Sequence, residues 1–510
     1  MTVAFDVTGA QPPYNRGATT IVIEGRVMSH YPVDTNYFLV PAVSSRMEFD
    51  LDDLDVEGEV PPQLDGAFFR MQPDPFFPRM TDEDVYFNGD GVVGRFDFSK
   101  GKVGFKQRYA LTDKLKLEKK AGRALFGRYR NPLTDDPSVK GAIRGTANTT
   151  PLVHGKTLYA LKEDSPPLVM DANTLATRGY TDFNGKMKGQ TFSAHSKIDP
   201  ETGNLVAFGY NQTGPLTLDC TYMEVSPAGE LLKEVWFKAP YYCMMHDFGF
   251  TRDYVVFPVV PMVSSWERLK ALKPHFGFDK TLPIYLGVLP RNGKGEDIRW
   301  FKAPNQNACH VINAFNVGTK IHFDIPVSKG NGLWFFPDVD GSPFSAPDAM
   351  AFPTRWTVDY ASKSDDFESV KKLSDMGGEF PRIDDRHMSR EHRYAWWLVI
   401  DLARPFTASV GRGMNALGYM DYRTGRQTSW WAGEQCHLQE PCFVPRTPGS
   451  PEGDGYIVVV VDNVVSNYSQ LVVLDAQAID KGPLARIKLP FKLRAGLHGN
   501  WVDRAALPRT

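Results

Sequence analysis

Short runs of apolar residues, separated by turn signals, dominate the chain from about residue 57 onward. Val, Ile, Phe, Tyr and Trp crowd these runs, a composition that favours β-strands. Between the runs lie polar turns such as residues 199–203, whose sequence Asp-Pro-Glu-Thr-Gly predicts a hairpin. The clearest expected strands are 66–71, 91–98, 157–163, 204–210, 254–260, 320–325, 396–402, 456–462 and 469–475. The pattern predicts an all-β protein.

Helical periodicity is rare, and we expect helices only over about residues 112–130 and 264–272. No linker divides the chain, so one domain is expected over residues 1–510, with an irregular extension at 1–45 and the strands at about 57–505. The repeated order of strand, polar turn, strand and long loop favours a β-propeller, because radial blades bring distant segments to one axis. A pair of β-sandwiches or a jelly roll is the alternative.

Composition and charge narrow the class of protein. The 510 residues carry a formal net charge of −2, which gives no electrostatic basis for binding nucleic acid. The five cysteines are odd in number and lack CxxC spacing, so they are expected to be reduced thiols. The first residues lack the basic and apolar regions of a signal peptide, and no run approaches the roughly 18 apolar residues of a membrane span. We therefore expect a cytoplasmic protein without a membrane span.

Four histidines lie far apart in the sequence, each at the end of an expected strand-like segment: His195, His246, His310 and His498. A closed fold that returns repeatedly to one axis would bring them together. Four neutral imidazoles would then bind a transition metal, and imidazole suits iron, copper, zinc and nickel. Each histidine taken singly also fits a packed structural residue. His322, on another expected strand, illustrates that alternative.

Three glutamates are candidates for orienting these imidazoles. Neutral ligands leave the charge of a metal uncompensated, so carboxylates should accept the second N–H of each ring. Glu163, Glu379 and Glu440 occur in unusually apolar or Gly- and Pro-rich surroundings. They are therefore the expected partners of the histidines.

The same residues lie in motifs that resemble those of the carotenoid cleavage oxygenases. The similarity extends from about residue 64 to residue 501, through LDGAFFRMQPDP, FNGDGVVGRFDF, GTANTTPLVHGKTLYALKED, GGEFPRID, EPCFVPR and LHGNW. The resemblance implies a seven-bladed β-propeller with a cap of loops and helices over the active-site face. It also implies one non-haem Fe(II) per chain on the four histidines, O2 as co-substrate, and the three glutamates as hydrogen-bond partners of the ligands. Thr149 matches a position that lies beside the vacant coordination site in several relatives.

Within that family, the chain is similar to the lignostilbene and hydroxystilbene dioxygenases. Phe87, Tyr129 and Lys162 match substrate-pocket positions of this branch, in which the lysine and tyrosine bind the 4-hydroxyl group of a phenolic stilbene. Two simpler interpretations stay open. Lys162 also fits a solvated lysine paired with Glu163 or Asp164, and Phe87 also fits plain core packing.

The implied reaction is cleavage of the central C=C bond of a 4-hydroxystilbene into two aromatic aldehydes, within the breakdown of lignin-derived compounds. A phenol and a lysine have similar pKa values, so Lys162 and Tyr129 would stabilise phenolate character and make the alkene a better nucleophile toward oxygen. The pocket must mainly position the alkene. Two other functions stay open. One is cleavage of carotenoids or apocarotenoids at the same iron site, and the other is a non-catalytic propeller that binds protein partners.

The expected helix at 112–130 bears on the choice of substrate. A basic amphipathic helix can lie on an anionic membrane, and relatives that extract lipophilic polyenes use an apolar patch near this region. Here the apolar side is small, so a solvated face is expected, which suits a small phenolic substrate. The resemblance also implies a homodimer, although the residues themselves leave the oligomeric state open. The basic residues of the segment are Lys114, Lys116, Lys119, Lys120, Arg123 and Arg128.

Overall fold

The structure is a computed structural model that describes residues 44–81, 84–405 and 413–509. Almost all of the expected N-terminal extension at 1–45 therefore lies outside the described residues. The described residues form seven sheets of four to six strands and one two-stranded sheet. Within each sheet, the pairing is antiparallel throughout.

Four of the larger sheets follow one another between residues 150 and 372. The small sheet β16–β17 (Met262–Val263, Gly277–Phe278) lies in a loop of the third. The four sheets are β6–β9 (Thr150–His154, Thr157–Leu161, Leu168–Met170, Thr177–Tyr180), β10–β13 (Lys197–Ile198, Leu205–Tyr210, Asp219–Val225, Leu231–Lys238), β14, β15, β18 and β19 (Gly249–Phe250, Tyr254–Val259, Ile284–Pro290, Arg299–Ala303), and β20–β24 (Asn307–Ala308, Asn313–Val317, Lys320–Ser328, Phe352–Asp359, Ser369–Lys372).

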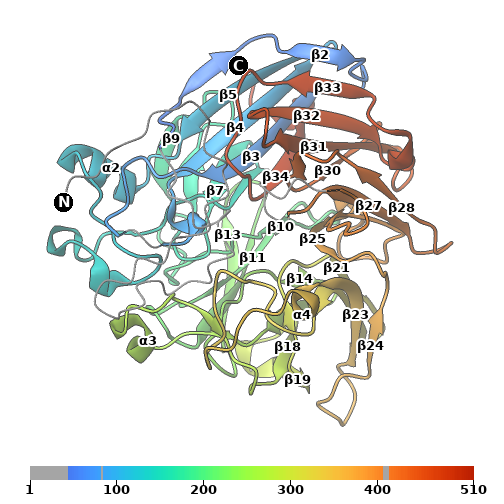
Figure 1. Ribbon diagram of the computed structural model, residues 1–510. Helices are drawn as coiled ribbons and strands as arrows, with labels where there is room; N and C mark the ends of the chain where they lie inside the picture. The colour runs from blue at the N-terminus through green and yellow to red at the C-terminus, as the bar shows by residue number, and fades with distance from the viewer. Residues whose placement is uncertain (1–43, 82–83, 406–412, 510) are drawn as a thin grey trace, which may run out of the picture.

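The other three sheets complete a ring, and two of them combine strands from both ends of the chain. Strand β3 pairs with β34, with Phe69 opposite Asn500, and β2 pairs with β33, with Val56 opposite Ile487. The three sheets are β25–β28 (Gly378–Arg382, Tyr394–Val399, Ala416–Asp421, Gln427–Trp431), β29–β33 with β2 (Cys436–Leu438, Cys442–Pro445, Gly455–Asn463, Tyr468–Asp475, Ala485–Lys488, Asp55–Gly58), and β34 with β3–β5 and β1 (Gly499–Asp503, Gly66–Pro73, Gly91–Ser99, Lys102–Tyr109, Phe49–Leu51). The fold is a seven-bladed β-propeller, in which the red C-terminal strands lie beside the blue N-terminal ones (Figure 1).

Strand β31 is apolar at almost every position because both of its faces are buried between neighbouring blades. Val458 and Val460 pack with Phe96 of one neighbouring sheet, whereas Val459 packs with Trp396 of the other. Successive side chains of a strand point to opposite faces, so a blade between two others buries both faces. The expected strand at 456–462 is thereby confirmed, and the other expected strands are found as well.

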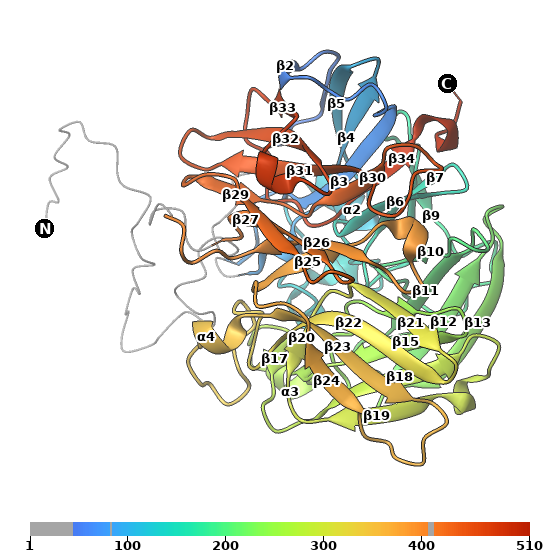
Figure 2. The same ribbon diagram turned by 90° about the vertical axis from the view of Figure 1, so that its right-hand side faces the viewer.

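The helices are short and lie between strands: α2 (Asp113–Ala121), α3 (Trp266–Lys270) and α4 (Ala346–Ala349), the last on one side of the propeller in Figure 2. The expectation of a helix to residue 130 is wrong, because Gly122 adopts a left-handed φ of 71° and ends α2. No helix in the described part of the chain has the length and apolar composition needed to span a bilayer.

The expectation of a solvated basic face on α2 is wrong for Lys114. This side chain is buried, and its Nζ lies 2.9 Å from Asp90 Oδ1 and 2.8 Å from Glu118 Oε2. Two carboxylates compensate the buried ammonium, which a helical periodicity could not reveal. The apolar side of the segment also packs inward, since Leu115 is fully buried.

Long loops that connect strands within and between blades pack against one another through aromatic side chains and form the expected cap. Phe87 contacts Phe335 with ring centroids 5.1 Å apart, and Tyr129 stacks on Phe336 at 6.0 Å. Phe276 also packs against Phe336, at 5.4 Å. Because these residues come from separate blades, the cap holds distant segments of the chain beside one another.

Candidate active site

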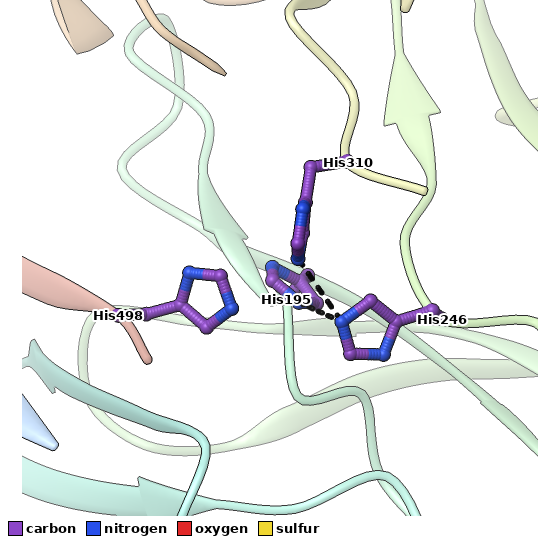
Figure 3. Close-up of side chains that lie close together, drawn as sticks. All are labelled: His195, His246, His310 and His498. Atoms are coloured by element: carbon purple, nitrogen blue, oxygen red, sulfur yellow. Dashed lines mark hydrogen bonds between the residues drawn. The ribbon is translucent and has the colours of Figure 1, made fainter. Parts of the chain in front are cut away.

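The four predicted histidines converge on one point (Figure 3). His246 Nε2 lies 3.0 Å from His195 Nε2 and 3.1 Å from His310 Nε2. The ring of His498 completes the group, with its centroid 4.4 Å from that of His195 and 4.9 Å from that of His310. One nitrogen from each of the four residues lies within 4.8 Å of all the others.

The position of these histidines relative to the strands differs from the expectation. Each precedes a strand at one edge of its sheet by one to three residues: His195 precedes β10, His246 precedes β14, His310 precedes β21 and His498 precedes β34. Only His310 also follows a strand closely, namely β20. The chain therefore places a histidine at the axis just before it starts the inner strand of a blade.

Each of three histidines holds a carboxylate on its other ring nitrogen. The His246 Nδ1 lies 2.5 Å from Glu163 Oε2, and the His310 Nδ1 lies 2.6 Å from Glu379 Oε2. Glu440 Oε1 is 2.9 Å from the Nδ1 of the fourth ring, His498. A carboxylate at Nδ1 fixes the tautomer, so that the Nε2 lone pair points to the centre of the group.

Each of the seven blades provides one of these residues. The blades that begin with β10, β14, β20 and β34 each provide a histidine. The other three provide the carboxylates, with Glu163 just after β7, Glu379 in β25 and Glu440 between β29 and β30. The whole ring of blades is thus needed to assemble the group.

The pKa values of the imidazoles differ within the group. Burial, and then the neighbouring imidazoles, hold the pKa of His195 well below its ordinary value. Burial also lowers the pKa of His498, against the opposing effect of Glu440. In His310 the burial effect is outweighed by Cys309 and Glu379, and its pKa is raised. A metal ion binds the neutral nitrogen and would displace that proton.

The donor set fits a single transition-metal ion. Two nitrogens that bind one ion at about 2.1 Å lie about 3.0 Å apart when they subtend a right angle. The separations around His246 Nε2, 3.0 and 3.1 Å, match this value. In His246, His310 and His498, the Nδ1 atom is already hydrogen-bonded to a glutamate. The Nε2 atoms of these rings are therefore the nitrogens that remain to bind a metal.

Lys162 and Tyr129 lie together on the cap side of this group. Lys162 is buried, and its Nζ lies 5.2 Å from the centroid of the Tyr129 ring. Its N–H groups donate to Asn148 Oδ1 at 3.0 Å and to the carbonyl oxygen of Phe87 at 3.2 Å. Among the described residues, no carboxylate forms an ion pair with this ammonium, so the interpretation of Lys162 as a solvated partner of its acidic neighbours is wrong.

Asn148 connects several of the predicted substrate-site residues, and sequence reasoning missed it. Its amide nitrogen donates to the carbonyl oxygens of Phe87 at 2.8 Å and Gly89 at 2.7 Å. Its Oδ1 accepts from Lys162, and from the hydroxyl of Thr149 at 3.2 Å. The sequence signal was its position directly before Thr149, inside the GTANTTPLVHG motif.

A second set of residues that the sequence did not single out joins the histidine segments to one another. Asp247, next to His246, forms an ion pair with Lys197, and its Oδ2 accepts from the backbone N–H of Val311 at 2.7 Å. The Lys197 Nζ also donates to the carbonyl oxygen of His195 at 3.2 Å. A single buried carboxylate therefore ties together the segments that carry three of the four histidines.

Asp247→Asn is expected to weaken metal binding by about 10-fold, at the lower end of what the loss of a ligand-orienting contact costs. The variant keeps the size of the side chain but loses the charge that pairs with Lys197. Titration of metal-free protein with a divalent metal measures the effect. Asp324→Asn is the control, because the Asp324 side chain is also buried, pairs with Arg355 at 2.7 Å and contacts His392, which is not one of the four axial histidines. Equal metal affinity in both variants would show that Asp247 does not position the ligands.

Comparison with known proteins now identifies the family. A family model described as retinal pigment epithelial membrane protein matches residues 42–503. The chain belongs to this family, the carotenoid cleavage oxygenases. Among its relatives, lignostilbene-α,β-dioxygenase isozyme III of Sphingomonas paucimobilis is 55% identical to this carotenoid cleavage oxygenase over 94% of this chain and 99% of that one.

Two further proteins are similar to this carotenoid cleavage oxygenase over most of their length. The isoeugenol monooxygenase of Pseudomonas nitroreducens is 42% identical over 90% of this chain and 96% of its own. The crystal structure of a lignostilbene dioxygenase from Pseudomonas brassicacearum superposes with a TM-score of 0.88 and 41% identity, covering 93% of this chain and 99% of that one. The family resemblance inferred from the motifs is thus confirmed.

Proposed function

We propose that the protein is a non-haem Fe(II) dioxygenase that uses O2 to cleave the central C=C bond of 4-hydroxystilbenes into two aromatic aldehydes. The observation that carries the proposal is the buried Lys162 ammonium, held by two neutral acceptors beside Tyr129. A buried cation without a counter-ion is costly, and a phenolate oxygen would compensate it. The similarity to enzymes named for lignostilbene and isoeugenol supports this substrate class.

The four axial histidines, His195, His246, His310 and His498, would hold one Fe(II) per chain. When bound, the iron supplies the activation of O2. The three glutamates accept a hydrogen bond from the Nδ1–H of their histidines, so the proton stays on Nδ1 and the lone pair of each Nε2 points inward. Four imidazoles alone accept several metals, and membership of the family supports iron among them.

Lys162 and Tyr129 would bind the 4-hydroxyl group of the substrate. The lysine ammonium has three N–H donors, two of which go to Asn148 and to the Phe87 carbonyl. We assign the third to the phenolic oxygen. Burial lowers the pKa of Lys162. The ordinary pKa values of a lysine and a phenol lie close together, so the two groups can share a proton.

This proton sharing would activate the alkene. A phenolic oxygen with phenolate character sends electron density through the conjugated ring to the C=C bond, which becomes a better nucleophile toward oxygen. Each alkene carbon forms one C=O bond as the C–C bond breaks, so one stilbene and one O2 give two aldehydes. Phe87 would form a wall of the pocket, and Thr149, fixed by Asn148, would border the oxygen site.

The test is aerobic incubation of the iron-loaded protein with a 4-hydroxystilbene and with its 4-methoxy analogue. We expect equal amounts of two aldehydes from the first and at least about 10-fold slower cleavage of the second, because a hydrogen bond to a charged group contributes about 1.5–3 kcal/mol. Preferred cleavage of an apocarotenal would favour a carotenoid substrate instead. Protein that retains no stoichiometric iron would favour a binding scaffold.

Three broader expectations complete the proposal. All five cysteines are free thiols, which supports a cytoplasmic location. The pairing of β2 and β3 with β33 and β34 supports a single propeller domain over about residues 57–505. The homodimer implied by the family would show twice the mass of one chain in light scattering. We propose no nucleic-acid partner, in line with the net charge of −2.

A further inference from the structure

Two pairs of consecutive residues connect the proposed phenol site with the histidine group. Tyr129 is followed by Arg130, and Lys162 is followed by Glu163. The first residue of each pair faces the phenol site, where Lys162 Nζ lies 5.2 Å from the Tyr129 ring centroid. The second residues meet on the other side, with Arg130 Nη1 at 3.0 Å from Glu163 Oε1. Glu163 in turn holds the Nδ1 of His246 at 2.5 Å.

Arg130 is held firmly in this arrangement. Its φ of 51° is left-handed, a conformation that residues other than glycine rarely adopt, so its contacts must maintain it. The buried guanidinium lies over the rings of Tyr210 and Phe276, 5.3 Å from each centroid. Nη1 also donates to the Tyr210 hydroxyl at 2.7 Å, and that hydroxyl donates to Glu163 Oε1 at 2.6 Å. Arg130 and Tyr210 together fix one oxygen of Glu163, while His246 fixes the other.

We propose that Arg130 is a positioning residue that couples occupation of the phenol site to the geometry of the metal centre through Glu163 and His246. This inference rests on the proposed function. A phenolic ring bound between Tyr129 and Lys162 contacts the two segments that carry Arg130 and Glu163. A displacement of either segment moves the carboxylate that orients the His246 ring. Such coupling is reciprocal, so a bound metal raises the affinity for the phenol by the same factor as the phenol raises that for the metal.

The chain offers a matched control at another glutamate that holds an axial histidine. Arg382 Nη1 lies 3.3 Å from Glu440 Oε2, and Glu440 holds the Nδ1 of His498 at 2.9 Å. Within the described part of the chain, the other hydrogen-bond partners of this arginine are Asp385, Gly499 and Asn500, none of which belongs to the phenol site. Arg382 therefore repeats the order arginine, glutamate, histidine without the connection to the substrate.

The experiment uses the Co(II)-substituted protein under argon, so that no turnover occurs and the visible absorption of the metal reports its ligand geometry. In the unaltered protein, a 4-hydroxystilbene is expected to shift the cobalt bands, and its 4-methoxy analogue to shift them much less. Arg130→Gln should abolish the shift at saturating 4-hydroxystilbene, Arg130→Lys should restore part of it, and Arg382→Gln should keep it. Both glutamine variants are expected to bind Co(II) about 10- to 100-fold more weakly, as for other groups that orient a metal ligand.

Calorimetry provides a second readout that a purely structural effect would not change. The unaltered protein should bind the 4-hydroxystilbene at least about 5-fold more tightly with Co(II) than without metal, the lower limit for a typical coupling. In Arg130→Gln this ratio should fall to one. Tyr210→Phe, which removes only the bridging hydroxyl, should lower the ratio as well, and it serves as the second variant if Arg130→Gln does not fold.

Several results would overturn the inference. These are an unaltered cobalt shift in Arg130→Gln, an equal loss in Arg382→Gln, or no phenol-dependent shift in the unaltered protein. The proposed function is tested separately by aldehyde formation in the iron-loaded protein. An enzyme that forms the aldehydes but shows no coupling would refute the inference alone.

Discussion

Replacing His246 by alanine is expected to leave the protein without bound iron and to lower stilbene cleavage by more than about 100-fold, because even the loss of a group that merely orients a metal ligand costs about 10- to 100-fold in metal affinity. His246 is the residue whose Nε2 lies close to two others of the group, at 3.0 Å from His195 and 3.1 Å from His310. Its removal also takes away one partner of Glu163, which keeps Arg130 and Tyr210. Iron per chain, measured by elemental analysis of freshly purified protein, and aldehyde yield are the two readouts.

The matched control is His322→Ala. His322 lies on β22, is half-buried, and contacts the Thr357 hydroxyl at 3.1 Å through its Nδ1, away from the axis. This variant should retain full iron and activity. Full iron in His246→Ala, with cleavage unchanged, would contradict the assignment of the four histidines as the metal ligands.

Replacing Lys162 by methionine is expected to lower kcat/KM for a 4-hydroxystilbene by about 10- to 100-fold, the equivalent of one hydrogen bond to a charged group. Methionine has a similar length and is apolar, so it fills the buried site without a charge to satisfy. The contacts that Lys162 makes with Asn148 and with the Phe87 carbonyl are lost, but no metal ligand is touched. The iron content should therefore stay at the level of the unaltered protein.

Two comparisons isolate the effect of the charge at this position. Cleavage of the 4-methoxy analogue, already slow, should change little in Lys162→Met, since that substrate has no proton to share. Lys116→Met on the exposed face of α2 should behave like the unaltered protein. Unchanged kinetics of Lys162→Met toward the 4-hydroxystilbene would remove the proposed phenolate mechanism.

The strand pattern could be predicted because burial leaves a direct record in the residue types. Residues 456–462 are apolar at almost every position, and β31 is indeed buried on both faces between two neighbouring blades. The axial histidines could be singled out because a polar ring in apolar surroundings is unusual. Their convergence depended on a closed fold, which the pattern of strands and loops already favoured.

The environment of charged side chains could not be predicted in the same way. Lys114 lies in a segment for which a solvated face was expected, and a solvated lysine was the open alternative for Lys162, yet both are buried. Lys114 forms ion pairs with two carboxylates, whereas Lys162 forms none with any carboxylate that the structure describes. That difference separates a structural lysine from a candidate substrate-binding one, and it depends on residues that are distant in the sequence.

The amino-acid sequence by itself determined the all-β class, the positions of the clearest strands and the family, and it singled out the four axial histidines and their three glutamate partners, because each of these leaves a local pattern of residue types or a motif. Only the tertiary structure decided that Asn148 holds Lys162, that Arg130 ion-pairs with Glu163, and that Asp247 joins the histidine segments. The physical reason is that a hydrogen bond requires two groups within about 3 Å. That distance is set by how the blades are arranged around the axis, and no single segment of the chain records it.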